Sequence, residues 1–175
     1  MLGKFIVLEG IDGCGKDTQQ KMLEVEFPDF ECFHVLDESK KHTNTLRDAM
    51  FKSDYKWDTM SEMLMFWADK FETILQIKKA IEQGKNVIMN RWELSNLAYQ
   101  IYGKNTPMSG GKKEKVDEEF ARFMQAKLDA ILKPDLYILF DVSVAESGRR
   151  IAIRKGQGYD RNDIMKPKRK TFLKG

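Results

Sequence analysis

The sequence predicts an α/β protein in which helices cover both faces of a parallel β-sheet. Four short apolar runs are typical of buried strands: residues 5–8, 30–36, 86–89 and 136–140. Between them, apolar residues recur with the helical period of about 3.6 residues over six segments: 16–26, 45–52, 60–83, 94–102, 116–132 and 145–154. Strands that alternate with helices are joined by crossovers that make neighbouring strands parallel. We therefore expect ligands to bind beyond the carboxyl ends of the strands.

Composition narrows the class of protein. The chain has 175 residues, of which 42% are apolar, enough for one buried core, so we expect a single domain over residues 1–175. The net charge of +3 is too small to favour nucleic acid or a membrane as partner. The apolar start of the chain is too short for a membrane span. Because Cys14 lies in a glycine-rich loop, a disulfide framework is not expected, and a soluble cytoplasmic protein is favoured.

That glycine-rich loop follows the first predicted strand and precedes a predicted helix. Its sequence from Gly10 to Lys16, GIDGCGK, fits the phosphate-binding pattern G-x-x-x-x-G-K. Glycines let the backbone turn its N–H groups toward a polyphosphate, the helix N-terminus adds positive potential, and Lys16 can reach the terminal phosphates. A mere connecting turn is the alternative, but the lysine and the preceding strand favour nucleotide binding. The residues expected to bind ATP are Gly10, Ile11, Asp12, Gly13, Cys14, Gly15, Lys16, Asp17 and Thr18.

One residue departs from the usual form of this loop. Asp17 stands where Ser or Thr normally binds Mg²⁺, and Thr18 lies about 100° further round the helix, so it cannot simply substitute. A carboxylate can bind Mg²⁺ directly or through water, but it also repels neighbouring phosphates. Glu9, Asp12 and Asp141 supply other carboxylates nearby. We expect Asp12, Asp17 and Asp141 to be the metal-binding residues.

Four segments resemble the thymidylate kinase family in the same order along the chain. LEGIDGCGKDTQ is similar to the family's F-E-G-x-D-G-x-G-K-S-T-Q, and LMFWADK to its L-L-F-A-A-D-R. NRW with SNLAYQ is similar to D-R-[YF]-x-x-S-x-x-A-Y-Q, and PDLYILFDV to P-D-L-x-x-x-L-D-V. The resemblance covers nearly the whole chain. It implies a three-layer P-loop NTPase fold and transfer of the γ-phosphoryl group of ATP to a deoxynucleoside monophosphate, most often dTMP, with Mg²⁺.

Position within these motifs implies an acceptor site. Phe66 would stack on the base, Lys70 would hydrogen-bond it in place of the family's arginine, and Arg91 would hold the acceptor phosphate. Core packing is the alternative role for Phe66, and an internal ion pair for Arg91. An arginine just past a buried strand is expected to have few structural partners, whereas a guanidinium binds phosphate in bidentate fashion. The expected acceptor residues are Asp12, Glu38, Arg47, Phe66, Lys70, Arg91, Asn96, Tyr99 and Gln100.

The resemblance also implies an arginine-bearing lid, at about residues 149–163. Gly13 stands where some members of the family carry an arginine, so the lid is expected to neutralise the transferring group. The expected catalytic cations are Lys16, Arg91, Arg150 and Arg154.

Further departures leave alternatives open. Asn90 replaces the family's aspartate, and the chain stops soon after residue 161, so we expect four strands, with the usual fifth strand and the C-terminal part of the fold absent. One alternative is a deoxynucleoside kinase that acts on a 5′-hydroxyl, with Asp37 or Glu38 as base. The other is a non-catalytic nucleotide-binding module. The resemblance also favours a homodimer.

Overall fold

The computed structural model describes residues 2–33, 46, 48–49, 54–102 and 117–155. The four strands found there form one parallel sheet with the order β2-β3-β1-β4. They are β1 (Phe5–Gly10), β2 (Glu31–Phe33), β3 (Val87–Asn90) and β4 (Leu136–Phe140). The parallel arrangement predicted from the sequence is therefore confirmed.

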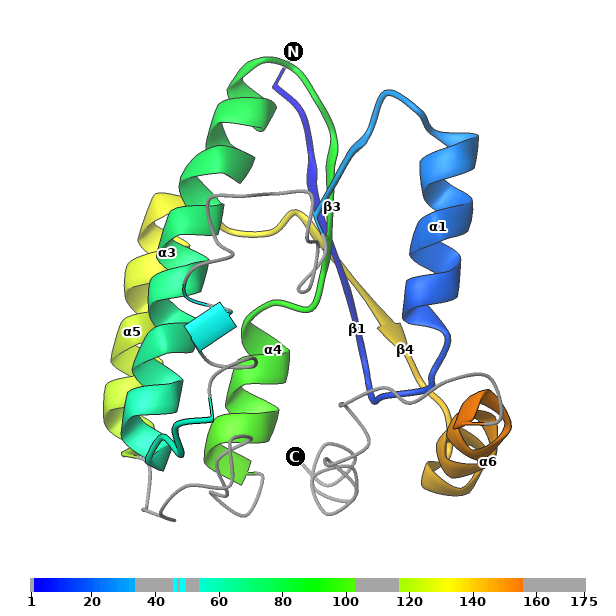
Figure 1. The fold of residues 1–175 in the computed structure, drawn as a ribbon. Coiled ribbons are helices and arrows are strands. Elements are labelled where there is room, and N and C mark those ends of the chain that lie inside the picture. Colours follow the sequence, from blue (N-terminus) through cyan, green and yellow to red (C-terminus); the bar gives the residue numbers. More distant parts are fainter. Residues whose placement is uncertain (1, 34–45, 47, 50–53, 103–116, 156–175) are drawn as a thin grey trace.

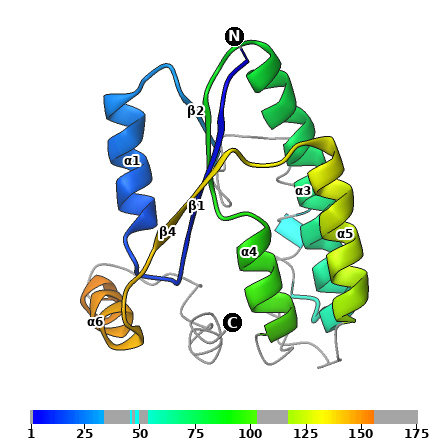
Figure 2. The ribbon, with the colours of Figure 1, turned by 180° about the vertical axis from the view of Figure 1, so that it is seen from behind.

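Helices lie on both faces of this sheet. Figures 1 and 2 show α3 and α5 side by side on one face, with α1 on the opposite face and α6 beyond the end of β4. The helical elements are α1 (Lys16–Glu26), α3 (Thr59–Glu82), α4 (Glu93–Asn96), the π-helical segment η1 (Leu97–Tyr102), α5 (Glu118–Ile131) and α6 (Val144–Lys155). The three layers expected of a P-loop NTPase fold are thus present. None of the described helices is long and apolar enough to cross a membrane.

Burial explains why the central strands carry unbroken apolar runs. Phe5, Val7 and Val87 have no exposed surface, because helices cover the sheet on both sides. The main core lies between the sheet and α3 with α5, where Trp67 and Ile74 are also buried. The sheet face under this core includes β1 and β3, which are paired side by side.

Side-chain caps set the starts of the two long helices. The carboxylate of Asp58 accepts a hydrogen bond from the backbone N–H of Ser61 at 2.8 Å, at the start of α3. Asp117 accepts one from the backbone N–H of Glu119 at 2.9 Å, at the start of α5. Each cap pairs an N–H group that has no partner within the helix itself.

Several expected boundaries changed or lie outside the described residues. The strand expected over 30–36 is present over Glu31–Phe33, and of the helix expected over 45–52 only residues 46, 48 and 49 are described, all helical. The expectation of one α-helix over 94–102 is wrong in its second half, where η1 replaces it. A π-helix has wider turns than an α-helix, and such segments are frequent at functional sites. The expectation of a missing fifth strand concerns residues after 155, outside the described part.

The topology decides where a site can form. β1 lies between β3 and β4, and the three strands run parallel, so their carboxyl ends reach the same edge of the sheet. Leu8 of β1 pairs with Asn90 at the end of β3. The loop after β1 and the turn after β3 are therefore neighbours.

Candidate active site

The phosphate loop joins β1 to α1 in the predicted place. Gly10 and Gly13 have φ angles of 149° and 74°, which side-chain-bearing residues rarely adopt. A Cβ atom on Gly10 would lie 2.8 Å from the carbonyl oxygen of Phe140, and one on Gly13 would lie 2.9 Å from the carbonyl oxygen of Ser147. Glycine is thus required at both positions by the backbone and by close neighbours on β4 and α6.

Lys16 is the first residue of α1, and its side chain is buried. Only 3% of the residue is exposed, and its Nζ donates to the carbonyl oxygen of Ile11 at 3.4 Å. Burial, followed by the charge of Arg91, lowers the pKa of Lys16 below its ordinary value. A second cation therefore lies close to Lys16, and an anion placed between them would stabilise both.

Arg91 directly follows β3 and extends over the phosphate loop. Its guanidinium donates to the carbonyl oxygen of Gly10 at 3.0 Å, to the Ser95 hydroxyl at 3.0 Å, and to the Asp12 carboxylate in an ion pair. Its cationic group also lies 5.3 Å from the ring centre of Tyr99. The expectation that Arg91 has few structural partners is therefore wrong. Its ion pair with Asp12 lies at the glycine-rich loop after β1.

The electrostatics and backbone of Arg91 are unusual. Burial opposes its charge, but Tyr99 and the carboxylates of Asp12 and Glu9 outweigh burial and raise the pKa of the guanidinium. Its φ of 68° makes it the only non-glycine residue with positive φ in the described part of the chain. Positive φ is costly for a side-chain-bearing residue and is found at sites where neighbouring structure holds it.

Glu9 supplies that support. It is fully buried near the end of β1, and its carboxylate accepts from the backbone N–H groups of Trp92 at 2.8 Å and Ser95 at 3.2 Å. Its Oε2 also accepts a hydrogen bond from the Ser95 hydroxyl, with an oxygen-to-oxygen distance of 2.5 Å. These bonds fasten the turn that carries Arg91. The carboxylate of Glu9, which the sequence analysis placed near the expected metal-binding residues, is thus engaged by this turn.

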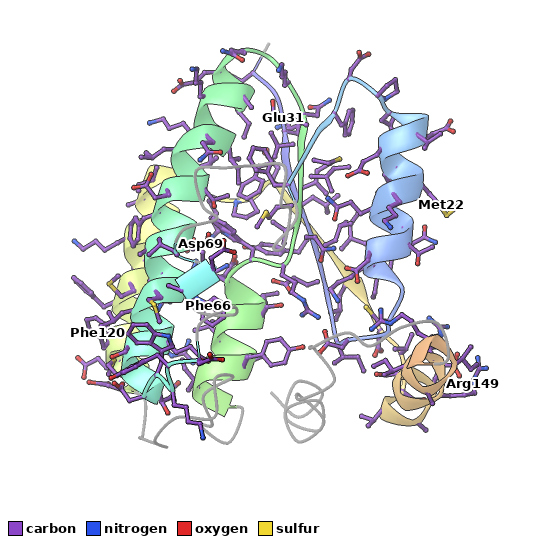
Figure 3. The ribbon with its side chains drawn as sticks, in the orientation of Figure 1. Met22, Glu31, Phe66, Asp69, Phe120 and Arg149 are labelled. Carbon is purple, nitrogen blue, oxygen red and sulfur yellow. The ribbon has the colours of Figure 1, made fainter. Side chains whose placement is uncertain are left out.

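The first part of the expected lid is a helix that contacts the phosphate loop. The Ser147 hydroxyl donates to the carbonyl oxygen of Asp12 at 2.5 Å, and Arg150 Nη1 donates to that of Cys14 at 3.0 Å. Arg149 instead points outward, as Figure 3 shows, and pairs with Glu146 within α6. The remainder of the expected lid, residues 156–163, lies outside the described part.

The two acceptor residues expected on α3, Phe66 and Lys70, lie in different surroundings. Phe66 is half-buried on α3, with Asp69 one turn further along the same helix (Figure 3). Lys70 is buried, and its Nζ lies 4.6 Å from the centre of the Trp92 ring. Lys70 also lies near Glu93, whose pKa is raised to about 7 mainly by burial. The side chain of Lys70 therefore contacts the turn after β3.

Two further expected acceptor residues lie on α4 and η1. Asn96 is buried, and its Nδ2 has no hydrogen-bond partner in the described part of the molecule, so it is available to a ligand. Tyr99 is buried against Arg91, and burial raises the pKa of its hydroxyl to about 12. Glu38, Arg47 and the side chain of Gln100 lie outside the described residues.

Comparison with known proteins agrees with this geometry. The thymidylate kinase family model matches residues 8–174. The chain belongs to the thymidylate kinase family. A probable thymidylate kinase of Methanococcoides burtonii is 32% identical over 177 residues, which cover 99% of this chain and 83% of that protein. The thymidylate kinase of a Thermoanaerobacter species is 32% identical over 181 residues, which cover 99% of this chain and 84% of that protein.

Solved thymidylate kinases share the fold. The enzyme from Candida albicans superimposes with a TM-score of 0.69 at 23% identity, over 99% of this chain and 77% of that one. The enzyme from Ehrlichia chaffeensis superimposes with a TM-score of 0.62 at 26% identity, over 90% of this chain and 89% of that one.

Two departures from the thymidylate kinase pattern meet in space. Asn90 Nδ2 donates to Asp17 Oδ1 at 2.6 Å, although the two residues are 73 positions apart. Burial alone would raise the pKa of Asp17, but Lys16 and the Asn90 amide outweigh it and lower the pKa. The sequence marked each departure separately and held no signal that the two residues touch.

The expected metal-binding residues are dispersed around the loop. Asp12 pairs with Arg91, Asp17 with Asn90, and Asp141 is exposed just after β4. The described residues contain no group of three or more Asp, Glu, His or Cys residues placed to hold a metal ion.

Proposed function

We propose that this chain transfers the γ-phosphoryl group of ATP to dTMP, forming dTDP and ADP. The observation that carries the proposal is the pair of buried cations at the carboxyl ends of β1 and β3. Lys16 and Arg91 lie close enough for the charge of Arg91 to lower the pKa of Lys16. Asp12 and Asp17 already offset part of the repulsion between these two cations, and anions that bind between the cations would offset more of it. Donor and acceptor phosphates that face each other would supply those anions.

The chemistry needs alignment and charge more than a base. The acceptor phosphate is largely ionised at neutral pH, because its second pKa is about 6, so no side chain has to create the nucleophile. Transfer is roughly in line, through a loose transition state that cations stabilise. Lys16 and the loop N–H groups would hold the donor phosphates, and Arg91 the acceptor phosphate. In this proposal a phosphate displaces Asp12 from the guanidinium of Arg91.

The helix α6 would add further cations. Arg150 already donates to the Cys14 carbonyl, and Arg154 lies near enough to lower the pKa of Asp17. No side chain fits at Gly13 while α6 is packed there, since a Cβ would contact Ser147. An arginine on α6 is thus well placed to neutralise the transferring group. Closure of the lid over the phosphates would exclude water and limit hydrolysis of ATP.

The acceptor nucleoside would lie between α3 and α4 with η1. Phe66 would stack on the thymine, and the unpaired Nδ2 of Asn96 would donate to the nucleoside. Lys70 and Tyr99 complete the described part of this site, and Glu38, Arg47 and Gln100 are included from the resemblance. A lysine lacks the planar fork of an arginine, so we expect looser selection of the base.

Mg²⁺ is the proposed cofactor beside ATP. The carboxylates of Asp12 and Asp17 are hard oxygen ligands at the loop, and Asp12 Oδ2 is buried without a hydrogen-bond partner among the described residues. Asp141 would act through water. When bound, Mg²⁺ would supply positive charge that offsets the charge of the donor phosphates.

The domain organisation, the cellular compartment and the oligomeric state are also part of the proposal. We expect one kinase domain over residues 1–175 that acts in the cytoplasm, on small molecules and without nucleic acid or membrane as partner. The two cysteines are not joined by a disulfide, which suits a reducing compartment. Exposed Leu64 and Leu75 on α3 support a homodimer through sheet-covering helices, which sedimentation or light scattering would test.

The first experiment is a substrate screen. The chain is incubated with ATP, Mg²⁺ and each deoxynucleoside monophosphate, with thymidine as a separate acceptor, and ADP and the phosphorylated product are both followed. Rapid dTDP formation with little product from thymidine supports the proposal. Phosphorylation of thymidine would instead support a deoxynucleoside kinase, and tight ATP binding without product a non-catalytic module.

Variants then test the two cations. Lys16→Ala and Arg91→Ala should each lower turnover by about 10²-fold or more, because each removes charge from the transition state. Lys78→Ala and Arg122→Ala remove exposed cations from α3 and α5 and serve as matched controls. Near-normal turnover of the first pair would refute the assigned roles.

A further inference from the structure

The contact between Asp17 and Asn90 joins the first turn of α1 to the end of β3. Its Nδ2 to Oδ1 distance is 2.6 Å, and only 5% of Asn90 is exposed. A carboxylate only accepts hydrogen bonds, so the amide nitrogen of Asn90 must face Asp17. The amide orientation is thereby settled by chemistry.

That orientation leaves the other atom of the amide without a partner. Asn90 Oδ1 is buried and accepts no hydrogen bond within the described part of the chain. A buried acceptor is normally paired, and an unpaired one at a functional site commonly faces a ligand or water. Asn90 therefore presents an unpaired oxygen immediately beside the carboxylate of Asp17.

The position of Asp17 points the same way. Asp17 lies in the first turn of α1, directly after the loop that would bind phosphate, and its Oδ1 accepts from Asn90. A bare carboxylate there would repel a triphosphate, whereas a divalent cation between them would convert repulsion into attraction. The oxygens of Asp17 and Asn90 would therefore be unfavourable next to a bound triphosphate unless a cation lay between them and the phosphates.

We propose that Asp17 and Asn90 form one cation-binding pair that replaces the hydroxyl ligand of the phosphate loop. Asp17 would hold the Mg²⁺ of MgATP, and Asn90 would orient that carboxylate through Nδ2 and offer Oδ1 as a second acceptor at the same place. The inference rests on the proposed function, since it requires that the loop bind ATP.

The pair also explains why the two departures occur together. The usual family pattern has a hydroxyl at position 17 and a carboxylate at position 90, and this chain has a carboxylate at 17 and an amide at 90. Each arrangement holds one carboxylate and one neutral oxygen ligand. An aspartate at both positions would place two carboxylates in contact, and Asn90 avoids that repulsion.

The test measures nucleotide binding and not turnover. ATP affinity is measured by calorimetry or with a fluorescent ATP analogue, once with EDTA and once with saturating Mg²⁺, and the ratio gives the Mg²⁺-dependent gain. Asp17→Asn should lose about tenfold or more of that gain. It should also bind metal-free ATP at least as tightly as the natural chain, because the repulsive charge is gone. A merely structural role for Asp17 would weaken both affinities together.

Three more variants make the result decisive. Asp17→Ser and Asn90→Asp should each reduce the gain, and the double variant Asp17→Ser with Asn90→Asp should restore it to within about threefold of the natural chain, since close pairs are not additive. Glu26→Gln removes an exposed carboxylate from the same helix and is the matched control. The double variant also keeps the test valid if Asp17→Asn fails to fold.

The possible outcomes separate the two proposals. An unchanged Mg²⁺ gain in Asp17→Asn and Asp17→Ser overturns the cation-binding pair while the kinase proposal stands. If the Mg²⁺-dependent gain of the double variant is no larger than that of the single variants, the idea that positions 17 and 90 have exchanged ligand types is overturned. Absence of ATP binding in the natural chain, with or without Mg²⁺, overturns the proposed function and this inference with it.

Discussion

Replacing Glu9 by glutamine tests how the turn that carries Arg91 is held. The buried carboxylate accepts hydrogen bonds from the N–H groups of Trp92 and Ser95 and from the Ser95 hydroxyl. Hydrogen bonds to a charged group contribute about 1.5–3 kcal/mol each, and neutral ones about 0.5–1.5 kcal/mol. Glutamine keeps one oxygen for the two N–H donors but presents an NH₂ group to a hydroxyl that already accepts from Arg91. Two weakened bonds, at about 1 kcal/mol each, and one lost bond, at about 2 kcal/mol, predict a loss of about 4 kcal/mol.

Urea unfolding measures this loss. The free energy of unfolding of Glu9→Gln is compared with that of Glu72→Gln, which removes an exposed carboxylate from α3. Affinity for dTMP, measured by calorimetry, should fall as well, because Arg91 depends on the same turn. A loss no larger than that of Glu72→Gln, about 0.5 kcal/mol or less, would show that the carboxylate does not hold the turn.

Three other perturbations test separate parts of the site. Gly13→Ala should lower the free energy of unfolding by about 2–3 kcal/mol, because φ is 74° and the new Cβ would lie 2.9 Å from the Ser147 carbonyl oxygen; an unchanged urea midpoint would contradict this. Burial raises the pKa of Glu93 to about 7 from 4.5, so the folded state holds a proton that the unfolded chain releases. Stability should therefore fall by about 3 kcal/mol as pH rises from about 4.5 to about 7 and level off above that, and urea curves at several pH values should show no such decline in Glu93→Gln. Arg150→Ala should lower kcat by about tenfold or more with little change in stability, whereas Arg149→Ala, on the outward side of α6, should leave kcat nearly unchanged in the same steady-state assay.

The sequence was a good guide to the elements and to the phosphate loop. Predicted boundaries of α1 and α6 agree with the structure within one residue, because helical periodicity is a local signal. The loop from Gly10 to Lys16 is recognisable in the sequence because the residues of its motif are contiguous in the chain. The change from α4 to η1 was not predictable, since apolar spacing does not distinguish a π-helix from an α-helix over so short a segment.

Roles that depend on distant neighbours were less accessible. The motif identifies Arg91 and leaves an internal ion pair open as its alternative role, but only the structure names Asp12 as the partner. Only the structure shows that Glu9 accepts from the turn after β3. Lys70 was placed beside the base, and the structure adds its contact with Trp92. A motif identifies a residue type, whereas burial and hydrogen bonds decide which partner that residue meets.

By itself the sequence determined the class of fold and the position of the glycine-rich loop, and it predicted which cations would serve phosphoryl transfer, because periodicity and contiguous motifs are written into neighbouring residues. Only the tertiary structure decided that Asp17 meets Asn90 across 73 positions, and that Ser147 of α6 closes on the loop at Asp12 across 135. Such contacts arise from strand order and helix packing, which bring together residues that no local pattern connects.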